Sequence, residues 1–195
     1  MRIILIDNYD SFTYNIVHYL EQLNVEVNVV FNDNKVCPDW DAFDAVLISP
    51  GPGLPHESGF LMDWLMTIPQ NKPVLGICLG LQAMVVHFGG VLRNLESPLH
   101  GQSGKLLAIS NGNIWSSIAV PIKIGHYHSW VGDERSIPRC LEILARDEED
   151  RVMALRHTEK PWYALQFHPE SILSENGMVW FERWIAHCVS PNSIT

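Results

Sequence analysis

Residues 74–88 read Val-Leu-Gly-Ile-Cys-Leu-Gly-Leu-Gln-Ala-Met-Val-Val-His-Phe, and this stretch decides the fold. Val74–Ile77 is an apolar run of strand length, and residues 79–88 have the length and composition of a buried helix. Only Cys78 separates the two, so the chain must turn sharply there. A glycine stands two residues before and two residues after it, where side chains would crowd the turn. The pattern is typical of a strand–turn–helix unit in an open α/β sheet.

Other segments repeat this alternation of strand and helix through the first half of the chain. We expect strands at Ile3–Ile6, Val25–Val29 and Ala45–Ile48, and helices after Ser11, which can cap the first one, and at Phe60–Ile68. The second half is richer in strands, expected at Lys105–Ile109, Ile118–Ile124, Leu141–Ala145, Val152–Leu155 and Tyr163–Phe167, before a closing helix at Met178–His187. The fold predicted is α/β, an open and mostly parallel sheet with helices on both faces, as in flavodoxin-like folds, and a smaller antiparallel or mixed sheet added. One domain should cover residues 1–189, with a tail at 190–195.

Composition excludes several classes of function. The chain has 195 residues and a net charge of -9, so it lacks the basic surface that nucleic acids require. No apolar run is long enough to span a membrane, and Asp7 interrupts the first one too early for a signal peptide. The four cysteines form no C-x-x-C pair. We therefore expect a cytoplasmic protein without membrane or nucleic-acid partners.

Cys78 is the strongest candidate for a catalytic residue. Its strand–turn–helix setting is that of a nucleophile elbow, with cysteine in place of serine. The helix N-terminus that follows favours the thiolate, the reactive form of cysteine. The N–H of Leu79 points into the same space and could stabilise an oxyanion. The alternative is a buried structural cysteine, which is the commoner role of cysteine in general.

A base for such a nucleophile is present in the segment Gln166-Phe167-His168-Pro169-Glu170. A residue before proline is biased towards extended backbone, in which residues two apart face the same side. His168 and Glu170 should therefore project together. The carboxylate would then hold one imidazole nitrogen while the other faces Cys78.

The segment Ser49-Pro50-Gly51-Pro52-Gly53 predicts a rigid loop with exposed backbone, able to direct an N–H at a developing negative charge. His126 and His128 alternate on an expected strand and could share a zinc ion. No third or fourth ligand stands at a suitable spacing, so we expect polar side chains at a strand end and no metal. The sequence also has neither a phosphate-binding loop nor a dinucleotide fingerprint, and no cofactor is expected.

Taken together, these segments resemble the class I, triad-type glutamine amidotransferases over essentially the whole chain. The resemblance is carried by Pro50-Gly51-Pro52-Gly53, by Gly76-Ile77-Cys78-Leu79-Gly80-Leu81-Gln82-Ala83 and by Gln166-Phe167-His168-Pro169-Glu170-Ser171. Further segments narrow it, namely Asp7-Asn8-Tyr9-Asp10-Ser11-Phe12-Thr13-Tyr14-Asn15, His100-Gly101, His128-Ser129-Trp130 and His168-Pro169-Glu170-Ser171-Ile172-Leu173-Ser174. They resemble the small subunits of anthranilate synthase and of 4-amino-4-deoxychorismate (para-aminobenzoate) synthase.

The resemblance implies a role for each matching residue. The catalytic triad would be Cys78, His168 and Glu170. Gly53 and Leu79 would supply the oxyanion N–H groups, with Gly51 and Pro52 in the same glutamine site. Gln82 and the backbone of Ser129 and Trp130 would hold the amino-acid end of glutamine.

Three residues depart from the family pattern. Leu81 stands where many relatives have histidine, Gln102 where a lysine commonly follows His-Gly, and Trp130 where leucine is usual. None of them removes a member of the triad. Gln102 could weaken a contact with a partner subunit, and Trp130 should act mainly through its backbone.

The function implied is hydrolysis of L-glutamine through a cysteinyl thioester. The ammonia would pass to a separate chorismate-using large subunit, since nothing in this chain is built to use it. The first expectation is anthranilate synthase component II, in tryptophan biosynthesis. The alternatives are the same subunit of 4-amino-4-deoxychorismate synthase in folate biosynthesis, one subunit serving both enzymes, and, more remotely, a stand-alone cysteine hydrolase of γ-glutamyl compounds. The segment Asp7–Thr13 is expected near the mouth of the site, either contacting the synthase or packed as a structural loop.

Overall fold

The computed structural model describes residues 1–189, so the tail expected at 190–195 lies outside the described residues. The strands are β1 (Arg2–Asp7), β2 (Glu26–Phe31), β3 (Ala45–Ile48), β4 (Val74–Ile77), β5 (Leu92–Ile109), β6 (Ile122–Gly132), β7 (Leu141–Asp147), β8 (Val152–His157) and β9 (Trp162–Leu165). The helices are α1 (Thr13–Gln22), α2 (Leu61–Leu65), α3 (Leu79–His87) and α4 (Gly177–Val189), with short 3-10 turns at Trp40–Ala42, Pro55–Glu57 and Glu134–Ser136. Within residues 1–189 no helix combines the length and apolar character needed to cross a membrane.

The strands form one mixed sheet of nine strands in the order β2-β1-β3-β4-β9-β8-β7-β5-β6. The first five are parallel to their neighbours, and the remaining pairs are antiparallel. The predicted α/β architecture is therefore observed, but the antiparallel strands continue the parallel sheet instead of forming a separate one. Strand β9 joins the two parts, because it runs parallel to β4 on one side and antiparallel to β8 on the other.

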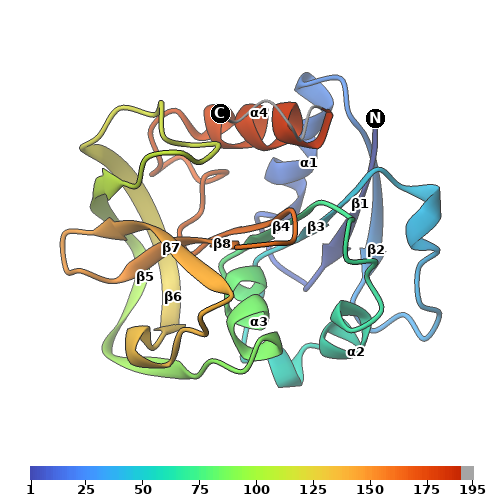
Figure 1. The fold of residues 1–195 in the computed structure, drawn as a ribbon, viewed down its shortest axis with the longest axis horizontal. Coiled ribbons are helices and arrows are strands. Elements are labelled where there is room, and N and C mark those ends of the chain that lie inside the picture. The colour runs from blue at the N-terminus through green and yellow to red at the C-terminus, as the bar shows by residue number, and fades with distance from the viewer. Residues whose placement is uncertain (190–195) are drawn as a thin grey trace.

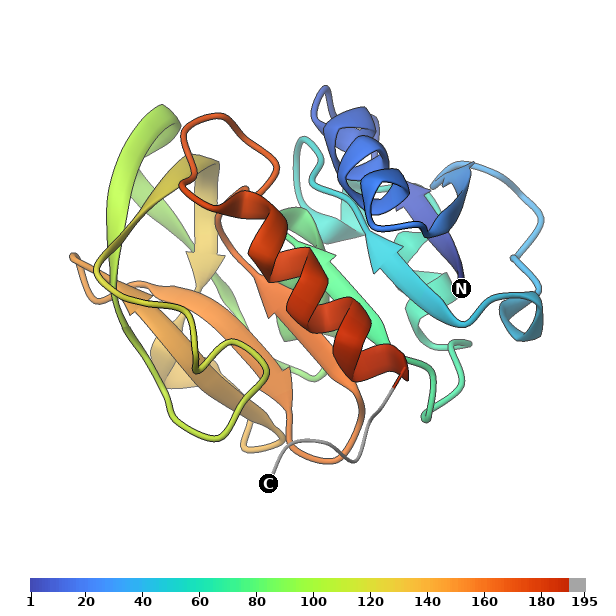
Figure 2. The same ribbon diagram turned by 90° about the horizontal axis from the view of Figure 1, so that it is seen from above.

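Helices cover both faces of the parallel part. Figures 1 and 2 show α1 and α4 side by side on one face, with α2 and α3 on the other. The first layer buries Trp180, Phe181 and Trp184 of α4 together with Ile16 and Leu20 of α1. Each such side chain contributes roughly 1.5–3 kcal/mol of hydrophobic free energy. Because both faces are covered, the central strands are continuously apolar, which is why their sequence signal was strong.

The largest difference from the predicted elements is the β5–β6 hairpin. Strand β5 begins at Leu92, well before the predicted start at Lys105, and β6 runs on to Gly132. Most side chains of the missed part of β5 are exposed or half-buried, and its register against β6 shifts twice. A strand held by pairing with a neighbour, without a buried face of its own, carries no apolar alternation. At the other end, Pro121 has no N–H to donate, and β6 starts after it and not at Ile118.

Two helix predictions also change. Ser11 does not cap α1. Phe12 occupies the N-cap position, and the carboxylate of Asp10 accepts the Phe12 N–H at 2.8 Å. Helix α2 stops at Leu65, although apolar spacing continues to Ile68. Ile68 precedes a proline, which disfavours helical backbone there.

The turn between β4 and α3 depends on two glycines. A Cβ on Gly76 would lie 2.6 Å from the carbonyl carbon of Gly80, and a Cβ on Gly80 would lie 2.8 Å from the carbonyl oxygen of Ile48. Both distances are shorter than real Cβ contacts. Helix α3 therefore starts directly against the backbone of β3 and β4, as the sequence predicted.

The substitution Gly80→Ala tests this close approach. In an open helix position it would stabilise the protein by ~1 kcal/mol, because alanine favours helix. Here we expect the reverse, a loss of about 2 kcal/mol from overpacking against the backbone of Ile48. Thermal unfolding would measure this as a fall in Tm of about 4–8 °C.

Gly112→Ala is the control, since nothing lies within 4 Å of a Cβ there and only the positive φ of 72° opposes it. It should cost ~1 kcal/mol. A Gly80→Ala protein at least as stable as the wild type would show that the turn tolerates a side chain.

Candidate active site

Cys78 lies at the carboxyl edge of the sheet, between β4 and α3. Its backbone has φ 52° and ψ -97°, in the region that non-glycine residues rarely adopt. The strain is held from both sides, because the Cys78 N–H donates to the Leu165 carbonyl at 2.7 Å and its carbonyl accepts from Gln82 at 3.1 Å. The side chain is 4% exposed. As the first residue of α3, Leu79 has an N–H that the helix itself cannot satisfy.

His168 and Glu170 lie close together just after the carboxyl end of β9, the strand that pairs with β4. The Nδ1 atom of His168 lies 2.7 Å from Oε1 of Glu170, and both side chains are buried. The route to this contact differs from the one we expected. The segment is a turn closed by the Ser171 N–H donating to the His168 carbonyl at 3.2 Å, not an extended strand end. The predicted pairing forms, but the extended-backbone reasoning behind it is wrong.

The second nitrogen of His168 is left for Cys78. Among the described residues Nε2 has no hydrogen-bond partner, although it is buried. Burial by itself lowers the pKa of His168. The charges of the Glu170 carboxylate and the Cys78 thiolate outweigh this and hold the pKa well above its ordinary value. The imidazolium form of His168 is therefore favoured beside Cys78 at neutral pH.

Aromatic side chains hold His168 on its remaining sides. The Tyr127 ring centroid lies 5.0 Å from that of His168, and the Phe12 ring lies 5.6 Å from it. The Tyr127 hydroxyl is also 3.1 Å from Oγ of Ser171, in the same turn as the histidine. Asn15 donates to the Glu170 carbonyl at 3.4 Å. The loop after β1 and the start of α1 thus pack directly on the His168–Glu170 turn.

The loop predicted to expose its backbone, residues 49–53, lines a cleft beside Cys78 with Gly51, Pro52 and Gly53. Gly51 approaches Asn8 so closely that a Cβ on it would be 2.5 Å from the Asn8 side chain. The Asn8 amide donates to the Ser49 carbonyl at 2.9 Å. Gly53 has φ 73°, which favours glycine. The end of β1 therefore fixes the path of the loop.

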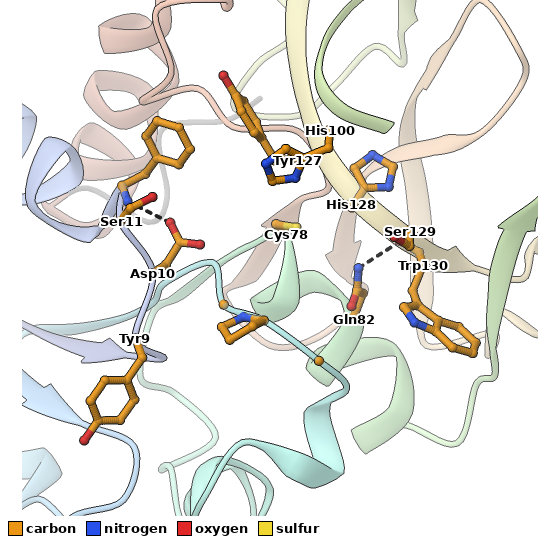
Figure 3. A pocket seen from close by; sticks show the side chains of 14 residues that line it. Tyr9, Asp10, Ser11, Cys78, Gln82, His100, Tyr127, His128, Ser129 and Trp130 are labelled. Carbon is orange, nitrogen blue, oxygen red and sulfur yellow. Dashed lines mark hydrogen bonds between the residues drawn. The ribbon is translucent and has the colours of Figure 1, made fainter. Parts of the chain in front are cut away.

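A cleft of about 570 Å³ opens beside Cys78, and the buried side chains of His168 and Glu170 lie outside its lining. It is lined by Tyr9, Asp10, Ser11, Phe12, Gly51, Pro52, Gly53, Cys78, Gln82, His100, Tyr127, His128, Ser129 and Trp130. Seven residues were assigned to glutamine binding by resemblance, and all of them except Leu79 line this cleft. Leu79 was assigned through its backbone N–H. Nε2 of Gln82 donates to the Trp130 carbonyl at 2.9 Å, and the Trp130 ring points away from Cys78 (Figure 3).

His126 and His128 lie inside β6, not at a strand end as expected. Both are buried, and Nδ1 of His126 lies 3.1 Å from Nε2 of His128. Burial lowers the pKa of His126 to about 4 and that of His128 to about 3. The pair is therefore neutral at physiological pH. Among residues 1–189 no group of three or more His, Cys, Asp or Glu side chains could hold a metal ion.

Three neighbours of the predicted site residues were given no chemical role in the sequence analysis, although His100 and Gln166 stand in motifs quoted there. Tyr127 packs on His168, His100 lines the cleft, and Gln166 lies 3.6 Å from the Cys78 sulfur through its Nε2 atom. Gln166 could have been singled out, because it follows an apolar strand that ends beside the strand leading to Cys78. The aromatic packing depends on the β5–β6 hairpin, which carried no clear sequence signal.

Comparison with known proteins assigns the family. A family model described as glutamine amidotransferase class-I matches residues 4–188. The chain belongs to the class I glutamine amidotransferases. This amidotransferase is 39% identical to aminodeoxychorismate synthase component 2 of Escherichia coli K12, over 90% of this chain and 94% of the relative. It is 38% identical to anthranilate synthase component 2 of Mycobacterium tuberculosis H37Rv, over 96% of this chain and 83% of the relative.

A solved structure gives the same family resemblance. The amidotransferase superimposes with a TM-score of 0.86 on a Thermoplasma acidophilum protein thought to be a GMP synthase subunit. The match covers 100% of this chain and 96% of the other, at 26% sequence identity. The mixed sheet is thus shared with a relative of distant sequence.

The neutral histidine pair predicts how stability responds to acid. Unfolded, His126 binds a proton near pH 6.5, whereas the folded amidotransferase keeps it neutral until about pH 4. Folding stability should therefore fall as pH drops through this window, by about 1.4 kcal/mol per pH unit from His126 alone. His126→Gln should remove the contribution of His126 to this pH dependence. The free energy of unfolding, measured with urea at pH 6.5 and at pH 4.5, should therefore fall less in the variant than in the wild type.

Titrating groups away from this pair, including His168 with its raised pKa, are present in both proteins. His128 contacts His126, but burial is the first cause of its low pKa, so His128 should stay neutral in the variant over the same pH range. Equal losses in wild type and variant between those two pH values would show that His126 is not neutral in the folded state.

Proposed function

We propose that this chain is a glutaminase that hydrolyses L-glutamine at Cys78 and delivers the ammonia to a chorismate-using synthase. The observation that carries the proposal is the His168–Glu170 pair, bonded at 2.7 Å, whose free imidazole nitrogen is buried beside the strained elbow of Cys78. A nucleophile, a base and an orienting carboxylate in this arrangement are the requirements for acyl transfer.

The chemistry follows from the geometry. The Cys78 thiolate attacks the side-chain amide carbon of glutamine, and the N–H groups of Leu79 and Gly53 stabilise the oxyanion that forms. The His168 imidazolium gives its proton to the nitrogen, which leaves as ammonia. The neutral imidazole then takes a proton from water, which attacks the thioester and releases glutamate. Glu170 fixes the imidazole throughout.

The remaining cleft residues suit glutamine binding. Gln82 and the backbone at Ser129 and Trp130 lie on the wall opposite the Asp10–Phe12 loop, with Cys78 between them (Figure 3). These groups would hold the amino-acid end of the substrate. Gly51 and Pro52 line the cleft next to Gly53, one of the two proposed oxyanion donors. No step of this reaction calls for a metal or another cofactor.

The partner is inferred from the relatives. The names of the curated relatives identify them as components of anthranilate synthase and of aminodeoxychorismate synthase. We take anthranilate synthase component II as the role of this chain, with 4-amino-4-deoxychorismate synthesis, or service to both, as the alternative. Adding the chain to each large subunit with chorismate and glutamine, and identifying the aminated product, decides between them.

The segment Asp7–Thr13 is the proposed contact with that large subunit. Tyr9 is 56% exposed at the cleft and stacks on Phe31, with ring centroids 4.9 Å apart. Its ring points away from Cys78 (Figure 3). Phe12 packs inward on Tyr127 and His168. One face of the loop thus contacts the catalytic turn while the other is free for a partner.

The first prediction of this proposal concerns Cys78→Ser. Glutamine-dependent synthesis by the complex should fall by roughly a thousand-fold or more, because the nucleophile is lost. Synthesis from added ammonia should persist, since the large subunit carries that step. Cys140→Ser, at a half-buried cysteine, is the matched control and should retain wild-type activity. Glutamine-dependent turnover close to wild type in Cys78→Ser would refute the assignment.

The second concerns Tyr9→Ala. An exposed aromatic residue at an interface commonly contributes about 1–2 kcal/mol, so affinity for the large subunit or stimulation of glutaminase activity should fall about tenfold. The isolated subunit should keep its Tm. Met66→Ala, which removes a side chain 70% exposed at the end of α2, should change neither quantity. If Tyr9→Ala binds and responds like the wild type, the loop is structural.

A further inference from the structure

Gln166 is placed beside the nucleophile by the sheet itself. Strands β4 and β9 pair in parallel, with Ile77 opposite Leu165 as the last pair. Cys78 and Gln166 are the next residue on each strand. The Gln166 N–H donates to the Met153 carbonyl of β8 at 2.9 Å, and the residue is 0% exposed. Its side chain therefore has a fixed origin one step beyond the strands.

The amide of this side chain is directed at sulfur. Its Nε2 atom lies 3.6 Å from Sγ of Cys78. Its Oε1 atom is buried without a hydrogen-bond partner among residues 1–189. An unpaired buried carbonyl costs about 1–3 kcal/mol, so a packing role alone would be served better by an apolar side chain. The contact with sulfur is the one polar interaction that the described structure gives this amide.

The direction of that hydrogen bond selects a charge state of the cysteine. The amide nitrogen can only donate, and a thiolate accepts more strongly than a thiol. His168 reaches the site from the turn after Phe167, only two residues beyond Gln166. The sulfur thus accepts a hydrogen bond from the amide and lies within the electrostatic reach of the His168 imidazole, and both groups favour its negative form.

We propose that Gln166 is a catalytic residue whose side-chain amide stabilises the Cys78 thiolate, both before attack and when the thiolate departs from the thioester. The inference rests on the proposed function of Cys78. In attack, the sulfur electron pair forms the bond to the amide carbon and the hydrogen bond weakens. In hydrolysis, water adds its oxygen to the same carbon, the carbon–sulfur bond breaks, and the electron pair returns to sulfur beside the amide N–H. Glutamine and water are the only reactants.

The test is the pH profile of Cys78 alkylation in the full chain, with iodoacetamide as the probe and mass spectrometry of the peptide that holds residue 78. Gln166→Met removes the donor at similar length, and Gln166→Glu keeps the shape but replaces the donor with a carboxylate. Both should shift the midpoint of alkylation up by about one pH unit, the effect of one hydrogen bond to a charged group. At a pH below the midpoint, alkylation of Cys78 should then be about tenfold slower than in the wild type, and slower in Gln166→Glu than in Gln166→Met. Glutamine kcat/KM of the complex should fall about tenfold.

Gln22→Met, the same change at an exposed position near the end of α1, is the control and should leave the profile unchanged. The ionisable groups around the sulfur are His168 and Glu170 and, along the cleft, Tyr9, Asp10, His100, Tyr127 and His128, and all of them are the same in every variant. A structural role would lower Tm without moving the midpoint.

The outcomes separate this inference from the proposed function. If Cys78→Ser keeps the glutamine-dependent synthesis of the wild-type complex, Cys78 is not the nucleophile, and the proposed function itself is wrong. If Cys78 is activated but both Gln166 variants keep the wild-type midpoint, the amide does not stabilise the thiolate. Loss of the folded state in both variants would mark the amide as structural and overturn the inference.

Discussion

The close contact between the backbones of α3, β3 and β4 underlies the rest of the structure. Helix α3 begins so near to β3 and β4 that neither Gly76 nor Gly80 has room for a Cβ. This contact forces Cys78 into a left-handed conformation at the point where strand becomes helix. The sulfur is thereby held above the sheet, and the first N–H of α3 is directed towards the same space. A looser junction would lower the backbone strain at Cys78, but it would no longer fix the positions of the sulfur and of this N–H.

The continuity of the sheet explains how residues from the two halves of the chain meet. Cys78 follows β4 and His168 follows β9, and these strands are hydrogen-bonded neighbours. The antiparallel strands then extend from β9 and return β6 to the opposite side, where Gly125 accepts the His168 N–H at 3.0 Å. The cleft is therefore bounded by elements that share a single hydrogen-bonded sheet, which sets their spacing.

The sequence predicted those parts of the molecule whose conformation is determined by residues close together in the chain. Buried parallel strands are apolar throughout, and the elbow needs its two glycines, so residues 74–80 could be interpreted directly. The His168–Glu170 contact was also predicted, although through the wrong backbone conformation, because a turn and an extended segment both bring side chains two apart together. The long β5 and the burial of His126 could not be foreseen. Each depends on pairing and packing with residues distant in sequence, and polar side chains give no sign of it.

The placement of Cys78 and His168 after neighbouring strands ties their spacing to the pairing of β4 with β9. The other walls of the cleft are the loop at 49–53, the loop at 9–12 and strand β6, which lies at the far edge of the same sheet. The rings of Phe12 and Tyr127, from two of these walls, pack on His168. A shift of either wall would therefore change the surroundings of the imidazole, so that the shape of the cleft and the environment of His168 are mechanically coupled.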